Sequence, residues 1–309
     1  MVNKRNKIVV VGSSNTDMVV RVGHFPKPGE TMLGSGFMTA QGGKGANQAV
    51  AAARLGGDTI FVARLGDDVF GKRSLQLLKA EGMDTRYVKT TPGVASGVAL
   101  ITVDDKAENE IIVASGANAH LSVDDVKAAE ADIKQAAILL MQLETPLPAL
   151  IYAAKVAHEA GVLVILNPAP FPPEPLPEEL LRHVDIIIPN ETEAQGMTGI
   201  EVTDDASVLA AIRAIQARGV GQVIITVGKR GAATMLDGQL ATIPTFPTKA
   251  VDTTAAGDTF CGALCVALSK GYKLQEAIRR ANKAASISVT RMGAQPSVPT
   301  ADEVFGQDL

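Results

Sequence analysis

The sequence lacks tryptophan, and it has only three tyrosines and eight phenylalanines among 309 residues. Side chains on which a nucleobase could stack are therefore scarce. Runs of basic residues are also missing, because no stretch of consecutive lysines and arginines exceeds two residues and the formal net charge is −4. A protein that binds a nucleic-acid backbone needs clustered positive charge. The composition thus argues against a nucleic-acid-binding protein.

Long apolar runs are absent from the sequence as well. A helix that crosses a bilayer needs roughly 20 consecutive apolar residues, whereas the longest candidates, such as 136–143, stop well short. The charged residues 1–7 are followed by only four apolar residues, 8–11, before Gly12. This pattern predicts a strand and not the core of a signal peptide. We therefore expect a soluble, cytoplasmic protein that does not contact a membrane.

The only two cysteines, Cys261 and Cys265, are four positions apart in a predicted helix. A disulfide between them would close no loop, and no histidine or further cysteine stands at the spacing of a zinc site. Both are predicted to be small, buried hydrophobic side chains. Because 46 % of the residues are apolar and only 20 % are charged, the chain has enough apolar material for a large core.

The residues that are present follow a repeating pattern. From about residue 120 to residue 290, a short β-branched run is followed by a segment of helical period, which predicts βαβ units and a parallel sheet. The predicted strands are apolar on both faces, so helices should cover both sides. We expect an α/β fold with a three-layer αβα, Rossmann-like core and a mostly parallel central sheet. The predicted strands are 137–142, 162–166, 185–188 and 222–227, and the predicted helices are 122–135, 146–160, 204–218, 257–270 and 273–290.

Two segments, 18–42 and 95–115, show strand alternation and turns without an intervening helix. The second contains the polar turn 104–109 between two apolar runs, which is typical of a hairpin. We expect these segments to form a small β lid on a single domain that spans 1–309. The apolar outer face of the lid is also a candidate dimer contact, because small isolated sheets are marginally stable.

The strongest functional signal is the segment 251–260, Val-Asp-Thr-Thr-Ala-Ala-Gly-Asp-Thr-Phe, which leads directly into an Ala/Leu-rich helix. A helix start with small side chains leaves backbone N–H groups accessible, and such a terminus binds anions. Asp258 could simply cap this helix. The nearby Asp252, and Gly257, which permits close backbone approach, favour a functional role.

A second segment, Gln-Gly-Gly-Lys-Gly-Ala-Asn-Gln at 41–48, precedes another helical run. It is not a P-loop, because Lys44 is followed by Gly45 and the spacing of GxxxxGK[ST] is not met. A glycine turn alone is a weak signal. Lys44 and Asn47 would nevertheless supply hydrogen-bond donors that suit a hydroxyl-rich substrate.

Further polar residues follow predicted strands: 12–17, Glu144, 189–193 and 226–231. Ligands of α/β sheets bind at the carboxyl ends of the strands, so these loops should line one cleft. Asn15 and Asp17, within the first of them, could instead merely close a turn.

These motifs resemble those of the ribokinase family of carbohydrate and nucleoside kinases. The match runs from Gly-Ser-Ser-Asn-Thr-Asp at 12–17, through Gly-Gly-Lys-Gly-Ala-Asn at 42–47 and Met-Gln-Leu-Glu at 141–144, to Gly-Ala-Gln-Pro-Ser at 293–297. Ala255 departs from the glycine usual in the wider family, but alanine is common there in the ribose-specific branch. The resemblance implies ATP-dependent phosphorylation of D-ribose at the 5-hydroxyl, giving D-ribose 5-phosphate and ADP.

The resemblance also implies roles for individual residues. Asp258 would be the catalytic base, within an anion hole formed by the backbone of Ala255, Ala256 and Gly257. The sugar would be bound by Asn15, Thr16, Asp17, Gly43, Lys44, Gly45, Ala46, Asn47, Glu144 and Asp258. The ATP side, with Glu193 helping to organise Mg²⁺, would comprise Asn190, Glu193, Thr226, Val227, Gly228, Lys229, Arg230, Gly231, Gly257, Asp258 and Asn282. An activating monovalent cation, usually K⁺, would be bound by Asp252, Thr254, Ser288, Arg291, Gly293 and Ser297. Members of this family also pair as homodimers through the β lid.

Other functions are open at this point. The substrate could be 2-deoxyribose, a hexulose or pseudouridine, although the polar candidate residues favour ribose. A dinucleotide-dependent oxidoreductase is disfavoured, because the first predicted strand is followed by Gly-Ser-Ser-Asn at 12–15 and not by GxGxxG. A non-catalytic sugar-binding regulator is a further alternative, and the presence of Asp258 in its loop of small residues argues against it.

Overall fold

The computed structural model describes residues 6–106 and 108–306. Its main sheet has nine strands in the order β13-β12-β11-β10-β9-β8-β1-β4-β5. Every pairing from β11 to β5 is parallel, and β12 and β13 add an antiparallel edge. The strands are β1 (Lys7–Val11), β4 (Asp58–Gly66), β5 (Asp84–Thr91), β8 (Ile138–Met141), β9 (Leu163–Leu166), β10 (Ile186–Ile187), β11 (Gln222–Thr226), β12 (Ala232–Leu236) and β13 (Gln239–Ile243).

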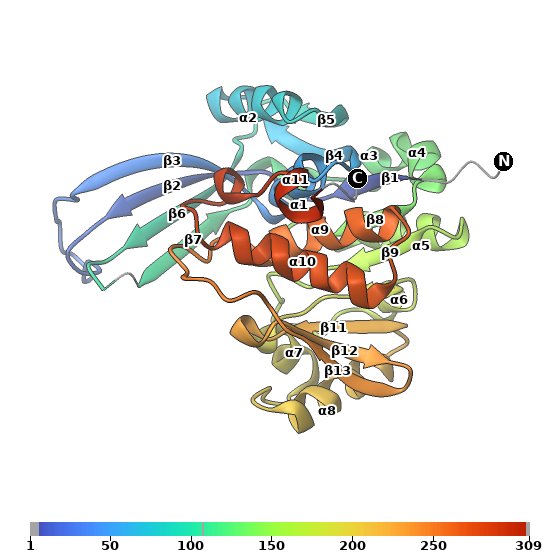
Figure 1. The fold of residues 1–309 in the computed structure, drawn as a ribbon. Helices are drawn as coiled ribbons and strands as arrows, with labels where there is room; N and C mark the ends of the chain where they lie inside the picture. Colours follow the sequence, from blue (N-terminus) through green and yellow to red (C-terminus); the bar gives the residue numbers. More distant parts are fainter. Residues whose placement is uncertain (1–5, 107, 307–309) are drawn as a thin grey trace.

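Helices cover both faces of this sheet (Figure 1). Side chains alternate along β1, so that Val9 and Val11 join one core cluster while Ile8 and Val10 join the other. The first cluster packs against α3 (Val123–Ala128), α4 (Glu130–Gln135), α5 (Leu147–Glu159), α6 (Glu178–Leu181), α7 (Glu191–Thr198) and α8 (Asp205–Gln216). The second packs against α1 (Lys44–Arg54), α2 (Val69–Ala80), α9 (Ala256–Ser269), α10 (Leu274–Ser288) and α11 (Ala301–Phe305). The predicted three-layer α/β core with a mostly parallel sheet is confirmed.

A second sheet, of four strands, extends away from the helical layers (Figure 1). Its order is β3-β2-β6-β7, with β2 (Asn15–Arg21), β3 (Gly36–Gly42), β6 (Gly97–Val103) and β7 (Asn109–Ala114). The predicted hairpin is β6 and β7, which pair antiparallel. Strand β2 begins at Asn15, because Asn15 pairs with Gly42 of β3 and with Gly97 of β6. The alternative that Asn15 and Asp17 merely close a turn is therefore wrong.

The local sequence signals explain several helix boundaries. Ser122 and Asp125 form the predicted capping box at the start of α3. The predicted helix 122–135 is divided into α3 and α4, which meet at Ala129.

Within the described residues, no helix is both long enough and hydrophobic enough to span a membrane. Three 3₁₀ segments, η1 (Gly116–His120), η2 (Gly228–Arg230) and η3 (Gln295–Ser297), lie in loops that are discussed below.

Candidate active site

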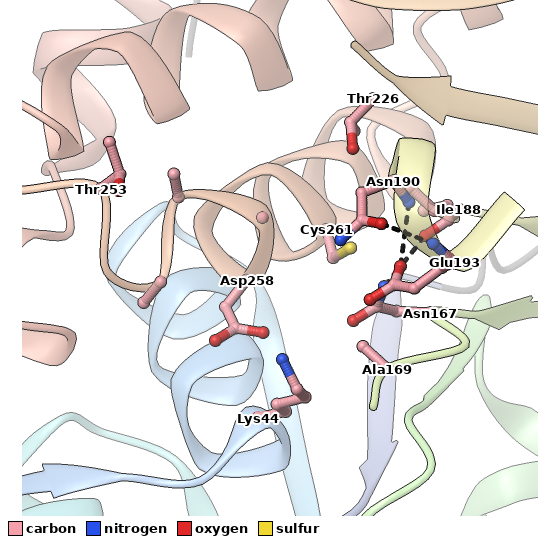
Figure 2. A pocket seen from close by; sticks show the side chains of 13 residues that line it. Lys44, Asn167, Ala169, Ile188, Asn190, Glu193, Thr226, Thr253, Asp258 and Cys261 are labelled. Atoms are coloured by element: carbon pink, nitrogen blue, oxygen red, sulfur yellow. Dashed lines mark hydrogen bonds between the residues drawn. The ribbon is translucent and has the colours of Figure 1, made fainter. Parts of the chain in front are cut away.

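Two pockets open beside the carboxyl ends of the parallel strands. The first, the α9 pocket, lies at the N-terminus of α9 (Figure 2) and is lined by Lys44, Asn167, Ala169, Ile188, Asn190, Glu193, Thr226, Thr253, Ala255, Ala256, Gly257, Asp258 and Cys261. The second, the β7 pocket, lies between the second sheet and the loop after β8, and is lined by Asn15, Val113, Ser115, Asn118, Ala119, Leu143, Glu144, Thr145, Pro146 and Pro170. The loops that were predicted to share a cleft thus border two adjoining hollows.

The start of α9 is formed by backbone with small side chains. Ala255 is the N-cap residue and adopts a left-handed conformation with φ 57°, which a residue with a Cβ atom rarely does. The space beside Gly257 is open where a Cβ atom would stand. Since the first N–H groups of a helix have no carbonyl partner within it, this loop offers amide donors and the positive end of the helix dipole to the pocket.

Asp258 lies in the first turn of α9 and is only 7 % exposed. Its Oδ2 accepts a hydrogen bond from Asn47 Nδ2 at 3.0 Å, and its Oδ1 accepts one from Gln48 Nε2 at 2.9 Å. Because the N-cap residue is Ala255 and makes no side-chain cap, the alternative that Asp258 caps the helix is wrong. The carboxylate is held against α1 and borders the α9 pocket.

Lys44 and Asp258 both project into the α9 pocket (Figure 2). Burial by itself would lower the pKa of Lys44, but the carboxylates of Asp258, Glu144 and Glu193 outweigh it, so the pKa is raised and the ammonium is charged. Burial raises the pKa of Glu193, although the Asn190 N–H and Lys44 oppose that shift. A lysine surrounded by three carboxylates is suited to balance charge on an anionic ligand.

Asp17 is the most perturbed carboxylate near the pockets. Burial, followed by repulsion from Glu144 and Asp258, raises its pKa from 3.8 to about 7. Asp17, Glu144 and Asp258 are therefore close enough to repel one another. Ligand hydroxyl groups that donate to Asp17 would relieve this repulsion.

Other residues orient the polar groups of the β7 pocket. Glu144 Oε2 accepts hydrogen bonds from Ser13 Oγ at 2.5 Å and from the Lys44 backbone N–H at 2.9 Å. The oxygen of Asn15 accepts a bond from Asn118 Nδ2 at 2.7 Å, and the oxygen of Asn118 accepts the Ser14 N–H at 2.9 Å. The amide nitrogen of Asn15 is thereby directed away from Asn118. Asn118 also donates Nδ2 to the Ser14 carbonyl at 3.3 Å, so its polar atoms are used, whereas Glu144 Oε1 and Asn15 Nδ2 have no hydrogen-bond partner among the described residues and remain for a ligand.

The glycine motif at 42–47 allows α1 to approach the loop after β1. A Cβ atom on Gly43, where φ is 86°, would stand 2.7 Å from the backbone nitrogen of Asn15. A Cβ atom on Gly45 would stand 2.4 Å from the backbone nitrogen of Ser13. The Ala46 N–H donates to the Ser13 carbonyl at 2.8 Å. Gly45 and Ala46 are therefore packed beneath the pockets. Thr16 is buried in β2 and points away from the face that carries Asn15 and Asp17.

The predicted nucleotide residues lie along the ends of β10 and β11. Asn190 and Glu193 form a capping box at the start of α7, in which Glu193 Oε2 accepts the Asn190 N–H at 2.9 Å. Thr226 lines the α9 pocket, and the residues after it, from Val227 to Gly231, turn through η2. Asn282 of α10 is buried and donates to the carbonyls of Ile243 and Pro244 at 2.8 and 3.3 Å.

The predicted cation residues lie in the loop before α9 and at or after the end of α10. Asp252 joins these loops, because its oxygens accept the N–H groups of Thr254 at 2.9 Å and Gly293 at 2.8 Å. Burial would raise the pKa of Asp252, but these hydrogen bonds lower it below its usual value. The Ser288 carbonyl accepts the Arg291 N–H, and Ser297 is buried in η3. The Asp252 carboxylate supplies oxygens that suit a monovalent cation, although the N–H groups of Thr254 and Gly293 already donate to them.

The relationship of the chain to known proteins agrees with this arrangement. A family model described as "pfkB family carbohydrate kinase" matches residues 5–301. The chain belongs to the pfkB family of carbohydrate kinases. The resemblance that the sequence motifs suggested is thereby confirmed, and membership of the pfkB family removes the oxidoreductase alternative.

Several relatives within the pfkB family are ribokinases. The ribokinase of Haemophilus influenzae is 47 % identical over 301 residues, which cover 97 % of this chain and 98 % of that protein. A deoxyribokinase of Salmonella typhimurium is 36 % identical over 296 residues and 96 % of each chain. Among solved structures, Arabidopsis thaliana ribokinase complexed with ribose and ATP superposes with a TM-score of 0.90 at 36 % identity, over 97 % of this chain and 98 % of that one.

Sequence reasoning missed the residues that hold the pfkB site together. Ser13, Gln48, Asn118, Gln142 and Asn167 were given no role, yet each makes a hydrogen bond to a predicted site residue or to its partner. Three of them, Ser13, Gln48 and Gln142, stand inside motifs already singled out, within two positions of a predicted ligand-binding residue. Asn47, which was predicted to bind the sugar, has its amide directed at Asp258 and at Gln295.

Proposed function

We propose that the protein transfers the γ-phosphoryl group of ATP to the 5-hydroxyl of D-ribose, with Asp258 as the catalytic base. The placement of Asp258 carries the proposal. This carboxylate lies in the first turn of a helix whose accessible N–H groups face the same pocket, and it is close enough to Asp17 and Lys44 to perturb the pKa of both. The high identity to ribokinases along the whole chain supports the choice of reaction and sugar.

In the proposed reaction, Asp258 accepts the proton of the sugar hydroxyl while that oxygen forms a bond to the γ-phosphorus. The bond from the γ-phosphorus to the bridging oxygen breaks, and ADP leaves. Phosphoryl transfer depends on alignment and on stabilising charge at the transferring group. The backbone of Ala255, Ala256 and Gly257 supplies donors for that charge, and Lys44 supplies a positive side chain.

The sugar is proposed to lie between the two pockets. Asp17 and one oxygen of Glu144 would accept hydrogen bonds from sugar hydroxyls, and the amide nitrogen of Asn15 would donate one. Gly43 and Asn47 would complete this side, Asn47 chiefly by holding Asp258. These groups are polar and several are buried, which suits a small polyhydroxy substrate better than a nucleobase.

ATP is proposed to occupy the α9 pocket and the adjoining turn from Thr226 to Gly231. Asn190 and Glu193 would stand near its phosphates, and Asn282 would support the segment beside the base. Mg²⁺ takes carboxylate oxygens, phosphates and water as ligands. Glu193 lines the pocket with only one oxygen used by Asn190, so this residue set fits a hydrated Mg²⁺ that would neutralise phosphate charge. K⁺ is proposed to bind at the loops joined by Asp252.

The second sheet is proposed to act as a lid over the sugar and to pair two copies of the chain. Its strands carry exposed apolar side chains: Phe37, Met38, Leu100, Ile111, Ile112 and Val113. Such a patch on one sheet is typical of an interaction surface. We place the single-domain enzyme in the cytoplasm. We also propose that it is a homodimer, and size-exclusion chromatography with light scattering would test this oligomeric state.

A coupled ADP-release assay over a panel of pentoses and hexoses, with and without K⁺, tests the proposed function. We expect D-ribose to give the highest kcat/KM, 2-deoxyribose to be weaker, and removal of K⁺ to lower the activity. If no sugar in the panel accelerates ADP release, the proposed function is wrong. If the rate is the same with Na⁺, K⁺ or neither ion, the cation site is wrong but the kinase is not.

A further inference from the structure

The side of Asp258 that faces the protein interior is occupied by a chain of amide side chains. Gln48 of α1 is fully buried, and its Nε2 donates to Asp258 Oδ1 and to Asn167 Oδ1, both at 2.9 Å. Its Oε1 accepts a bond from Gln142 Nε2 at 2.7 Å. Both amide hydrogens of Gln48 are thus donated and its oxygen accepts one bond. One of the two donated hydrogen bonds is made to Asp258, the proposed base.

The orientation of the Gln48 amide does not depend on Asp258. Asn167 donates its Nδ2 to the carbonyl of Ile188 at 2.9 Å, and a carbonyl can only accept. Asn167 must therefore turn its oxygen toward Gln48, which then has to present its nitrogen. Gln142 fixes the opposite end of the same amide. The ends of β8, β9 and β10 thus determine jointly where the amide hydrogens of Gln48 point.

This arrangement has a cost to the fold. Among the described residues, Gln142 Oε1 is fully buried without a hydrogen-bond partner. It also lies where a side chain at position 12 would stand, 2.2 Å from a Cβ atom built on Gly12. An unpaired buried amide oxygen costs about 1–3 kcal/mol, and an apolar side chain would avoid this penalty. A residue whose only function was to fill the core would not need this amide.

We infer that Gln48 is a positioning residue for Asp258. This inference rests on the proposed function, in which Asp258 is the base. By holding Oδ1, Gln48 fixes the plane of the carboxylate with respect to the sugar hydroxyl. Without it, Asn47 is the remaining side-chain donor to Asp258 among the described residues, and Asn47 itself is anchored by Gln295 at 3.3 Å. The carboxylate would then rotate away from the alignment that proton transfer requires.

Replacement of Gln48 by the similarly sized methionine tests the inference. In the proposed kinase assay, Q48M should lower kcat by about 10- to 100-fold, the usual value of a hydrogen bond to a charged group. The KM values for sugar and ATP should stay within about threefold, because Gln48 is fully buried and lines neither pocket. If Q48M changed the KM values alone and left kcat unchanged, the assignment of Gln48 as a positioning residue would be wrong.

A double-mutant cycle with Asp258→Asn separates positioning from a general effect on the fold. If Gln48 acts through Asp258, Q48M should change kcat by less than about threefold when Asp258 is already asparagine. If the two losses multiply, Gln48 acts independently of the base and the inference is wrong. Near wild-type turnover of D258N would instead overturn the proposed function, so the two failures are distinguishable.

Two additional variants make the test independent of folding problems. Q48E has the same shape and still accepts the bond from Gln142, but when ionised it turns an acceptor toward Asp258 Oδ1 and Asn167 Oδ1; because repulsion adds to the lost bond, it should lower kcat at least as much as Q48M, and by much less when Asp258 is already asparagine. Thr234→Val removes a hydroxyl that is equally buried in β12 and donates to the Val223 carbonyl at 2.6 Å. This control should lower the melting temperature without changing kcat. A loss of kcat in T234V comparable to that in Q48M would contradict the inference.

Discussion

The two sides of the site are built in different ways. On the α9 side, the segment from Thr253 to Gly257 is partly exposed and presents backbone, with a left-handed residue at Ala255. On the sugar side, Asn15 and Asp258 are buried side chains that other side chains hold. A phosphate can be bound by amides from many directions, whereas each sugar hydroxyl needs a donor or an acceptor in one place. This difference predicts that substitutions on the two sides of the site will affect catalysis, sugar binding and stability to different degrees.

The largest effect is expected where the two sides meet. Asp258→Asn should lower kcat by about 10²–10⁴, the usual contribution of a general base, with a modest change in KM for the sugar. Steady-state kinetics with D-ribose and ATP would measure this. If the turnover of D258N were close to that of the unmodified protein, Asp258 would not be the catalytic base.

Asp17→Asn should reveal the electrostatic strain of the sugar side. The pKa of Asp17 is about 7 in the fold against 3.8 ordinarily, so the unfolded chain releases this proton first and the unliganded fold loses stability as the pH rises from about 4 to 7. The loss is complete above pH 7 and on the order of 4 kcal/mol at most. We therefore expect D17N to raise the melting temperature at pH 8 and to leave it nearly unchanged at pH 4, while weakening sugar binding. Equal shifts at both pH values would contradict this explanation.

Asn118→Asp should invert one hydrogen bond on the sugar side. An aspartate still accepts the Ser14 N–H, but it loses the bond from Nδ2 to the Ser14 carbonyl and turns an oxygen toward Asn15, whose amide must then rotate to donate to it. The pocket would gain an acceptor where it had a donor. We expect KM for D-ribose to rise about 10- to 100-fold with KM for ATP unchanged. An equal rise in both KM values would indicate a general distortion.

Ala255→Gly should have the smallest effect, on the backbone side. Glycine relieves the left-handed conformation of Ala255 but increases the entropy of the unfolded chain, so the net stabilisation should be below about 1 kcal/mol. Activity should change less than twofold, since the N–H groups stay in place. Asp237→Gly, at another positive φ of 49°, is the matched control in the β12–β13 turn. Thermal denaturation of both variants measures the change in stability. A clear destabilisation by A255G would contradict the predicted small stabilisation.

The same contrast explains what the sequence could reveal. Short continuous apolar runs and helical segments predicted the central parallel strands β1, β8, β9, β10 and β11 and the helices beside them, because burial on both faces leaves a local pattern. The α9 loop was also recognisable, since its small residues are consecutive. The network around Gln48 was not, because its members come from positions 48, 142 and 167 and meet only when α1 and the strand ends pack together. Asn15 and Asp17 were site candidates from the sequence and remain predictions, and the start of their strand at Asn15 became visible only through its pairing with Gly42 and Gly97.

The raised pKa of Asp17 has a consequence for calorimetry. Near neutral pH this side chain is protonated in a fraction of the molecules before a sugar binds. A sugar that donates hydroxyl hydrogens to Asp17 would favour the ionised form and expel that proton into the buffer. The measured heat of sugar binding should therefore vary with the ionisation enthalpy of the buffer, and the number of protons released should shrink as the titration is moved to higher pH.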